Sequence, residues 1–369
     1  MSIATSRNKS IGLTRRVHSR SAPKRMDVGI LGATGVVGQQ LATLLAKHPW
    51  FRVTYLAASD RSVGRAYGEL PWRPSLPCSS DILALPVEKM QPGLGPKLIF
   101  SALDAAVADE AEAQFATAGH CVVSNAKSHR MDCLVPLLVP EINSEHLGLI
   151  AHQRKARGWT GAIVTNPNCS TIFLAMALAA VRQFKPCRVL VTTLQALSGA
   201  GYPGVSSLDA TANVVPFIGG EEEKIESETK KILGSFVKDS IVPASFPVSA
   251  QATRVPVLYG HTETVSVEFE ETVTSDEIVA AFRTFRGEPQ RLDLPTAPPH
   301  PIVCTEAADR PQPRLDVEKF GGMAVQVGRL RPCPVLGHKF ILLGHNTIRG
   351  AAGGTLLIAE LMHALGMLV

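Results

Sequence analysis

A cysteine lies at the junction of a strand-like and a helix-like run of the sequence. Cys169 follows the apolar run 161–165 and precedes the apolar run 171–178. The unpaired N–H groups and the dipole of a helix N-terminus favour thiolate, so we expect a lowered thiol pKa. Such a thiolate can attack an acyl group while backbone N–H groups hold the resulting oxyanion. The alternative is an inert structural cysteine, the commoner role of a free thiol.

A glycine-rich loop forms the second pattern with chemical meaning. GATGVVG (32–38) follows the short apolar run 27–31 and opens an amphipathic segment that reaches about residue 47. Backbone at such a strand-to-helix turn can approach a pyrophosphate. The spacing GxxGxxG differs from the usual GxGxxG, so a plain turn stays an alternative. The cofactor contacts predicted in this loop are Gly32, Thr34, Gly35, Val36 and Gly38.

The end of the second expected strand, 53–58, bears on the choice of cofactor. Asp60 lies near the place where an acid would hold the ribose 2′-hydroxyl of NAD. Its neighbours instead suit a 2′-phosphate, and they are Ser59, Arg61, Ser62 and Arg65. We therefore predict NADP, bound through Ser59, Arg61 and Ser62; a solvated loop is the alternative for the arginines.

The order of the remaining elements predicts two domains. Strands expected at 97–102 and 121–124 flank an alanine-rich helix at 105–118, which indicates a Rossmann-like, doubly wound parallel sheet. The second half predicts an α+β domain on a mainly antiparallel sheet. Its expected strands are 188–196, 253–258, 262–270 and 323–329, and its expected helices are 221–233 and 275–285. The proline-rich stretch 295–313 is expected to be a connecting arm, and 348–368 a closing helix.

These elements suggest domain boundaries. We predict an NADP-binding domain from 26–168 and 348–369, and a catalytic and oligomerisation domain from 169–347. Hydrophobic residues make up 45% of the chain and charged residues 19%, as in soluble enzymes. No apolar run approaches the roughly 20 residues that a membrane-spanning helix needs. The seven scattered cysteines predict neither disulfides nor a metal site, and they favour a reducing compartment.

The net charge of +5 is concentrated at the N-terminus. Seven basic residues precede the first acidic residue, Asp27, and the rest of the chain carries a net charge of −2. This mildly acidic body offers no electrostatic case for nucleic-acid binding. The segment 1–25 is typical of an organelle transit segment or of a disordered extension. We therefore expect the protein in the cytoplasm, or in an organelle if this segment targets it.

Eight stretches carry a family resemblance: GATGVVG (32–38), SNAKSHRM (124–131), TNPNCST (165–171), LQALSGAGYPGV (194–205), GGEEEK (219–224), RVPVLYGHTE (254–263), RPQPRLD (310–316) and HNTIRGAAGG (345–354). In these stretches the chain resembles the aspartate-semialdehyde dehydrogenases, of the branch shared by archaeal and fungal enzymes. The resemblance implies NADP-dependent reductive dephosphorylation of L-aspartyl 4-phosphate to L-aspartate 4-semialdehyde, in lysine, threonine and methionine biosynthesis.

The resemblance also implies catalytic roles. Cys169 would be the nucleophile that expels phosphate and forms a thioester, which then accepts hydride from NADPH. His261 would be the general acid/base, and Gln195 would orient the acyl-enzyme. The further cofactor contacts predicted are Ser101, Ser198, Gly199 and Asn346.

Substrate-binding residues follow from the same resemblance. Arg254 would clamp the α-carboxylate and Glu221 the amino group. Lys224 and Arg130 would bind the phosphate, with Asn125 beside them.

Each of these residues has a plainer alternative. His261 could be a packed or surface histidine, Arg254 half of a structural salt bridge, and Asn346 a helix N-cap. The run 221–224 could be a solvated helical face, or Glu222 could take the place of Glu221. Lys127 and His129 either add positive charge near the phosphate or point to solvent.

Other functions remain open. A malonyl-CoA reductase shares the scaffold, but a CoA thioester would make a phosphate-expelling site unnecessary. An N-acetyl-glutamyl-phosphate reductase carries a different cysteine motif. A catalytically silent, dehydrogenase-like binding protein would lose the cysteine or the histidine, and both are present. The expected partners are a small-molecule substrate and copies of the chain in a homodimer or homotetramer, with no nucleic acid or membrane.

Overall fold

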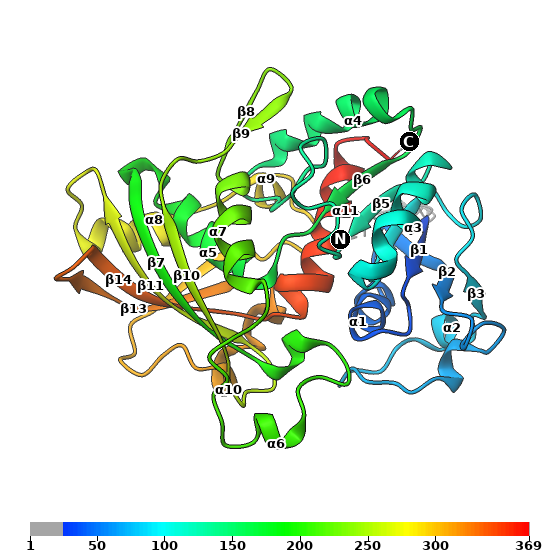
Figure 1. Ribbon diagram of the computed structural model, residues 1–369, viewed down its shortest axis with the longest axis horizontal. Coiled ribbons are helices and arrows are strands. Elements are labelled where there is room, and N and C mark those ends of the chain that lie inside the picture. The colour runs from blue at the N-terminus through cyan, green and yellow to red at the C-terminus, as the bar shows by residue number, and fades with distance from the viewer. Residues whose placement is uncertain (1–24, 369) are drawn as a thin grey trace, which may run out of the picture.

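The computed structural model describes residues 25–368. The basic segment 1–25, apart from Arg25, lies outside the described residues. Two six-stranded sheets dominate the molecule and lie on opposite sides of it, with the last helix between them in the view of Figure 1. A two-stranded hairpin completes the strands of the described part.

The first sheet is parallel throughout, in the order β3-β2-β1-β4-β5-β6. Its strands are β1 (Met26–Leu31), β2 (Phe51–Ala58), β3 (Val87–Lys89), β4 (Leu98–Ser101), β5 (Cys121–Ser124) and β6 (Ala162–Thr165). The associated helices are α1 (Val36–Leu45), α2 (Ser80–Leu83), α3 (Ala105–Thr117), α4 (Leu149–Arg157) and α11 (Gly353–Ala364). The predicted doubly wound sheet is therefore confirmed.

Strand β1 is buried on both faces. Val28 and Ile30 belong to the core formed with α1 and α11, whereas Leu31 belongs to the core formed with α3. A strand covered by helices on both sides needs apolar residues at successive positions. This requirement explains why 27–31 is an almost unbroken apolar run.

The second sheet has the order β10-β7-β11-β14-β13-β12. Its central pairs are antiparallel, and its two outermost pairs, β10 with β7 and β12 with β13, are parallel. Its strands are β7 (Pro186–Gln195), β10 (Val248–Arg254), β11 (His261–Phe269), β12 (Ile302–Thr305), β13 (Val325–Cys333) and β14 (Gly337–Gly344). The main helices of this half are α5 (Cys169–Ala180), α7 (Glu221–Ile232) and α8 (Ser275–Thr284). Shorter elements are α6 (Ser207–Ala210), β8 (Ser235–Val237), β9 (Ser240–Val242), α9 (Glu288–Arg291) and α10 (Pro313–Asp316). The mainly antiparallel sheet is thus confirmed, within a mixed sheet.

Helix α5 is apolar on every side. Residues 170–178 are all buried, because the helix packs against α7, α8, β11 and β14. A helix enclosed in this way has little freedom to move. It therefore holds its first residue, Cys169, in a defined position relative to the second sheet.

Two expectations for the second half are wrong. The strand expected at 253–258 is instead Val248–Arg254, because Pro256 has no N–H to give to a sheet ladder. The stretch 295–313 is more than a connecting arm, since it contains the edge strand β12, whose Ile302 lies in the core. Strand β14, between β11 and β13, was not anticipated from the sequence.

The closing segment returns to the first sheet. It begins as a short π-helix, η6 (Ile348–Ala352), and continues as α11, which ends at Ala364 rather than near residue 368. Leu356 and Leu361 of α11 pack in the same core as α1. Across residues 25–368, every helix is too short or too polar to cross a membrane.

Candidate active site

Cys169 is the first residue of α5, in the turn that follows β6, as the sequence predicts. Asn168 caps the helix, since its Oδ1 accepts a hydrogen bond from the Thr171 backbone N–H at 3.2 Å. The π-helix η6 brings backbone directly against the cysteine. A Cβ atom added to Gly350 would lie 2.5 Å from the Cβ of Cys169. Only glycine therefore fits at position 350.

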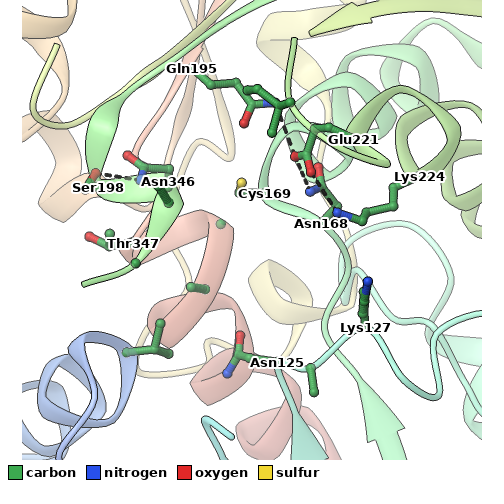
Figure 2. A pocket seen from close by; sticks show the side chains of 18 of the residues that line it. Asn125, Lys127, Asn168, Cys169, Gln195, Ser198, Glu221, Lys224, Asn346 and Thr347 are labelled. Carbon is green, nitrogen blue, oxygen red and sulfur yellow. Dashed lines mark hydrogen bonds and ion pairs between the residues drawn. The ribbon is translucent and has the colours of Figure 1, made fainter. Parts of the chain in front are cut away.

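A cavity of about 560 Å³ opens beside Cys169. Figure 2 shows the thiol between the Ser198–Asn346 pair on one side and the side chains around Glu221 on the other. Residues predicted from widely separated motifs meet there. The predicted residues that line this cavity are Asn125, Arg130, Cys169, Gln195, Ser198, Gly199, Glu221, Lys224, Arg254 and Asn346, together with Val36 of the glycine-rich loop.

A second cavity, of about 660 Å³, lies along the glycine-rich loop. It collects six residues of the predicted cofactor site, namely Thr34, Gly35, Val36, Ser59, Arg61 and Ser62. Val36, Asp104 and Gly201 line both cavities, so the two are contiguous. The combined shape suits an elongated dinucleotide whose one end reaches the cysteine.

Three residues of the predicted cofactor site line neither cavity. Gly32 has a φ of +69°, and a Cβ atom on Gly38 would lie 2.3 Å from the Gly32 carbonyl oxygen. These glycines thus allow the tight turn and the close approach of helix to strand. Ser101 is fully buried at the end of β4, and the structure does not bring it to the cavity surface.

Arg73 and Tyr202 lie at the second cavity and were not anticipated. The guanidinium carbon of Arg73 lies 4.1 Å from the centre of the Tyr202 ring, and its Nη1 donates a hydrogen bond to the Thr34 carbonyl at 3.2 Å. The pair links the loop after β7 to the glycine-rich loop. Nothing in the spacing of these residues along the chain connects them.

Glu221 is the centre of a hydrogen-bond network. Its Oε1 accepts from Asn168 Nδ2 at 2.5 Å and from Gln195 Nε2 at 3.2 Å, and its Oε2 lies 2.9 Å from Lys224 Nζ. Burial opposes ionisation, yet Lys224 and these hydrogen bonds together hold the pKa of Glu221 below its usual value. Glu222 instead accepts from the Ala252 N–H at 2.9 Å. Glu221, not Glu222, therefore faces the cavity.

The cation of Arg130 is partly used within the protein. Its Nη1 lies 3.1 Å from Glu228 Oε1, and its Nη2 donates to the Asn125 carbonyl at 2.8 Å. Glu228, a buried residue, was missed from the sequence. One signal was available, because Glu228 lies seven residues after Glu221, two turns along the same face of α7.

Lys127 and His129 have different surroundings. Lys127 is exposed and lines the first cavity, and no carboxylate of residues 25–368 lies within ion-pair distance of it. His129 is buried, 3.7 Å from Asp109 and 3.7 Å from Glu112. Lys127 thus adds positive charge to the cavity, and His129 does not point to solvent.

Arg254 is not part of a structural salt bridge among the described residues, and Asn346 is not a helix N-cap. The Nη1 of Arg254 donates to the Ala196 carbonyl at 2.8 Å, and the described chain offers it no carboxylate for a salt bridge. Asn346 accepts from the Gly260 N–H at 2.9 Å and donates to Ser198 Oγ at 2.8 Å. It therefore ties two loops together instead of capping a helix.

His261 is fully buried behind Gly199. Its Nδ1 accepts a hydrogen bond from the Ala196 backbone N–H at 3.0 Å. A Cβ atom on Gly199 would lie 3.0 Å from its Nε2, so Nε2 faces the residue that lines the cavity. Burial, with a contribution from Arg254, lowers the pKa of His261 to about 3.

The expected lowering of the thiol pKa is wrong for this geometry. Burial raises the pKa of Cys169 to about 12, and the Glu221 carboxylate adds to the rise. Arg130 and Arg254 act in the opposite direction. Desolvation of the thiol therefore outweighs the nearby positive charges in setting the direction of this pKa shift.

In the described part of the chain, His, Cys, Asp and Glu side chains nowhere gather in threes to hold a metal ion.

Comparisons with known proteins identify the family. Residues 27–150 match the family model "Semialdehyde dehydrogenase, NAD binding domain", and residues 178–349 match "Semialdehyde dehydrogenase, dimerisation domain". The aspartate-semialdehyde dehydrogenase of Archaeoglobus fulgidus is 50% identical over 342 residues, covering 92% of this chain and 98% of that protein. The malonyl CoA reductase (NADP) of Metallosphaera sedula is 40% identical over 347 residues, covering 92% and 97%.

Solved structures agree with this result. The crystal structure of aspartate semialdehyde dehydrogenase with NADP from Candida albicans superposes with a TM-score of 0.87 at 39% identity, covering 93% of this chain and 99% of that one. Relatives of archaeal and fungal origin thus match over almost their whole length. The chain belongs to the aspartate-semialdehyde dehydrogenase family, in the branch that archaeal and fungal enzymes share.

Proposed function

We propose that the chain catalyses the NADP-dependent reduction of L-aspartyl 4-phosphate to L-aspartate 4-semialdehyde, with release of phosphate. The observation that carries this proposal is the network around Glu221. One carboxylate connects the residue before Cys169, the amide of Gln195 and the ammonium group of Lys224 at the wall of a single cavity. Acidic and basic groups beside one thiol suit a substrate that carries an amino group, a carboxylate and a phosphate.

In this proposal the substrate is held by three contacts. Arg254 binds the α-carboxylate with its free guanidinium nitrogens, and Glu221 accepts from the α-ammonium group. Lys224 and Lys127 hold the phosphate, with Arg130 adding charge behind them. These contacts leave the acyl carbon beside Cys169, whose sulfur attacks it and forms a thioester as phosphate leaves.

NADP is the proposed cofactor. The Candida albicans relative is described with NADP, and Ser59, Arg61 and Ser62 together suit a 2′-phosphate at the far end of the second cavity. When bound, NADPH supplies the hydride that reduces the thioester carbon. Ser198 and Asn346 would meet its nicotinamide end, because they lie at the cysteine side of the joined cavities.

A second candidate is reduction of a CoA thioester, since a malonyl CoA reductase is among the relatives. Lys127 and Lys224 favour an acyl phosphate, because a CoA thioester has no phosphate at the reacting carbon. Two assays run in parallel separate the candidates. The first measures phosphate-dependent reduction of NADP by aspartate semialdehyde, and the second replaces these substrates with malonate semialdehyde and CoA. Faster turnover in the second assay would contradict the proposal.

Cys169→Ser tests the nucleophile. We expect loss of turnover with almost unchanged NADP binding, because the hydroxyl is a far weaker nucleophile at the same place. Cys133→Ser is the matched control, since Cys133 is an exposed thiol that lines neither cavity. Near wild-type turnover of Cys169→Ser would sink the assignment.

The same proposal covers assembly and domain organisation. The match of 178–349 to a dimerisation domain supports association of the chain with itself, as a homodimer or as a homotetramer. We place the NADP-binding domain at 26–168 and 348–369, which the packing of α11 with α1 supports, and the catalytic domain at 169–347. Light scattering of the purified protein measures the assembly.

The cellular location is a separate proposal. The protein resides in the cytoplasm, or in an organelle if the basic segment 1–25 acts as a transit segment. Fluorescent fusions with and without this segment distinguish the two, since only a transit segment changes the location when it is removed.

A further inference from the structure

A buried lysine of α7 is bonded to the loop that follows β5. Lys231 is only 5% exposed, and its Nζ donates to three carbonyl oxygens: those of Arg130 at 2.7 Å, Asp132 at 2.7 Å and Val135 at 2.9 Å. An ammonium group has three N–H donors, so these bonds use all of them. One side chain thus fixes the path of the loop segment 130–135.

Lys231 is one of two α7 residues that hold Arg130. Its ammonium binds the Arg130 carbonyl, while Glu228, three residues earlier on the same face of the helix, binds the guanidinium at 3.1 Å. Arg130 also lines the first cavity. The backbone and the side chain of this cation are therefore both fixed by α7, the helix that presents Glu221 and Lys224 to the same cavity.

The charge of Lys231 is unfavourable in this buried place. Burial lowers the pKa of its ammonium to about 8, and the neighbouring acidic groups only partly oppose the shift. The charged form is thus less favourable in the folded chain than in water, so stability alone does not explain a lysine here. The charged and titratable groups that face it are Arg130, Asp132 and Cys133 of the loop, Glu228 of α7 and the buried His146.

We propose that Lys231 is a positioning residue for phosphate: its ammonium holds the loop so that Arg130 and Lys127 meet the phosphate group of the substrate. This inference rests on the function proposed above, in which both cations serve the phosphate. Lys231 itself lines neither cavity, so it acts through the loop without touching the substrate. Loss of its ammonium should therefore weaken the binding of phosphate more than it changes kcat or the binding of NADP.

Lys231→Met and Lys231→Arg test the role of the ammonium in the phosphate-dependent reduction of NADP by aspartate semialdehyde. Methionine has no donor for the three carbonyls, whereas arginine keeps the charge and has five N–H donors. We expect KM for phosphate to rise about tenfold or more in Lys231→Met, and to stay within about threefold of wild type in Lys231→Arg. In both variants, kcat and KM for NADP should change by less than about twofold.

The matched control is Lys230→Met, at the neighbouring half-buried lysine that lines neither cavity. Circular dichroism establishes that each variant is folded. A purely structural lysine would change the free energy of unfolding without a selective change in KM for phosphate. An unchanged KM for phosphate in folded Lys231→Met, or equal losses in the two folded variants, would overturn the proposal.

Wild-type protein provides the test if neither variant folds. A neutral amine has two N–H donors for three carbonyls, so deprotonation of Lys231 leaves one carbonyl without its partner. KM for phosphate should then rise about fourfold from pH 7.5 to pH 9, across the pKa of about 8, while phosphate remains a dianion and KM for NADP stays constant. A constant KM for phosphate over this range would count against the proposal and overturn it.

Calorimetric titration with inorganic phosphate separates this inference from the proposed function. It measures the Kd for phosphate without turnover, in wild type and in the Lys231 variants. Failure of the proposed function would appear as wild-type protein inactive with aspartate semialdehyde. Failure of the inference would appear as active wild-type protein whose Kd for phosphate is the same in Lys231→Met.

Discussion

Glu228 accepts a hydrogen bond from the backbone N–H of Asn168 at 2.6 Å, directly before Cys169 in the chain. Its other carboxylate oxygen lies 3.1 Å from Arg130. One buried side chain of α7 therefore connects the turn that carries the thiol to a cation near the predicted phosphate position. Glu228 lies 60 residues after Asn168 and 98 residues after Arg130 in the sequence.

Glu228→Gln tests this link. The amide oxygen can still accept from Asn168, but Arg130 loses its ion pair and keeps only its hydrogen bond to the Asn125 carbonyl. Breaking a buried pair in this way costs about 3–5 kcal/mol in the free energy of unfolding, which urea unfolding measures. Glu223→Gln, on the exposed side of the same helix, should stay within about 0.5 kcal/mol of wild type. Equal stability of the two variants would contradict the role of Glu228.

Lys127→Met should weaken phosphate binding. Lys127 lines the cavity without a carboxylate partner in the described chain, so its full charge is available to an anion. A hydrogen bond to a charged group contributes about 1.5–3 kcal/mol, so we expect KM for phosphate to rise by about tenfold or more. Lys127→Arg should retain most of the affinity, and Lys89→Met is the control, because Lys89 lines neither cavity. An unchanged KM for phosphate in Lys127→Met would argue that Lys127 only faces solvent.

Tyr202→Ala should weaken NADP binding. The ring of Tyr202 stacks on Arg73 across the second cavity, and an exposed cation–π contact contributes about 0.5–1 kcal/mol. Fluorescence titration should show a Kd for NADP raised by about two- to fivefold, while Tyr202→Phe keeps the wild-type value. Phe217→Ala removes another exposed aromatic residue from the same half and serves as control. If Tyr202→Phe weakens binding as much as Tyr202→Ala, the hydroxyl and not the ring is responsible.

Gly350→Ala should disturb the thiol directly. The added methyl group would lie 2.5 Å from the Cβ of Cys169, so either η6 or α5 must shift. Overpacking of this kind costs about 1–3 kcal/mol, and a displaced thiol loses turnover because reacting atoms must be aligned. Thermal unfolding and the rate of thiol alkylation measure the two effects. Wild-type values for both would show that the backbone adjusts without consequence.

The buried side chain of Glu263 should make the free energy of unfolding depend on pH. It is fully buried, both its oxygens lack partners within residues 25–368, and burial raises its pKa well above 4.5. The unfolded chain releases this proton near pH 4.5, whereas the folded chain keeps it. The folded state therefore binds more protons, and stability is lost as pH rises from about 4.5 towards the folded pKa, by up to about 1.4 kcal/mol per pH unit.

Glu263→Gln removes this dependence. Urea unfolding should show that the variant gains stability relative to wild type at pH 7.5 and much less at pH 4.5. Glu268→Gln is a control in which stability should change with pH in the opposite direction, because Arg188 lowers the pKa of Glu268. Its ion pair is present above the usual pKa of glutamate and is lost on acidification. Parallel pH curves for wild type and Glu263→Gln would show that Glu263 is not buried as a neutral acid.

Local sequence pattern was sufficient for much of the fold. Five of the six strands of the first sheet, the position of Cys169 at the start of α5 and the glycine-rich loop follow from short runs in which strand, turn and helix residues are consecutive, whereas the short edge strand β3 was not anticipated. The same reasoning failed for β10 and β12. Both are parallel edge strands of a mixed sheet, and their pairing depends on partners more than twenty residues away.

Some features of the candidate site also follow from the sequence, whereas others depend on the tertiary structure. The sequence by itself determined which residue types are present and that Cys169, His261 and Glu221 belong to one family pattern. Only the tertiary structure decided their surroundings: burial raises the pKa of Cys169, and the Ala196 N–H donates to Nδ1 of His261. It also selected Glu221 over Glu222 and added Glu228 and the Arg73–Tyr202 pair. The physical reason is that desolvation and hydrogen bonding depend on which distant segments surround a group, whereas residue type and spacing record only its neighbours along the chain.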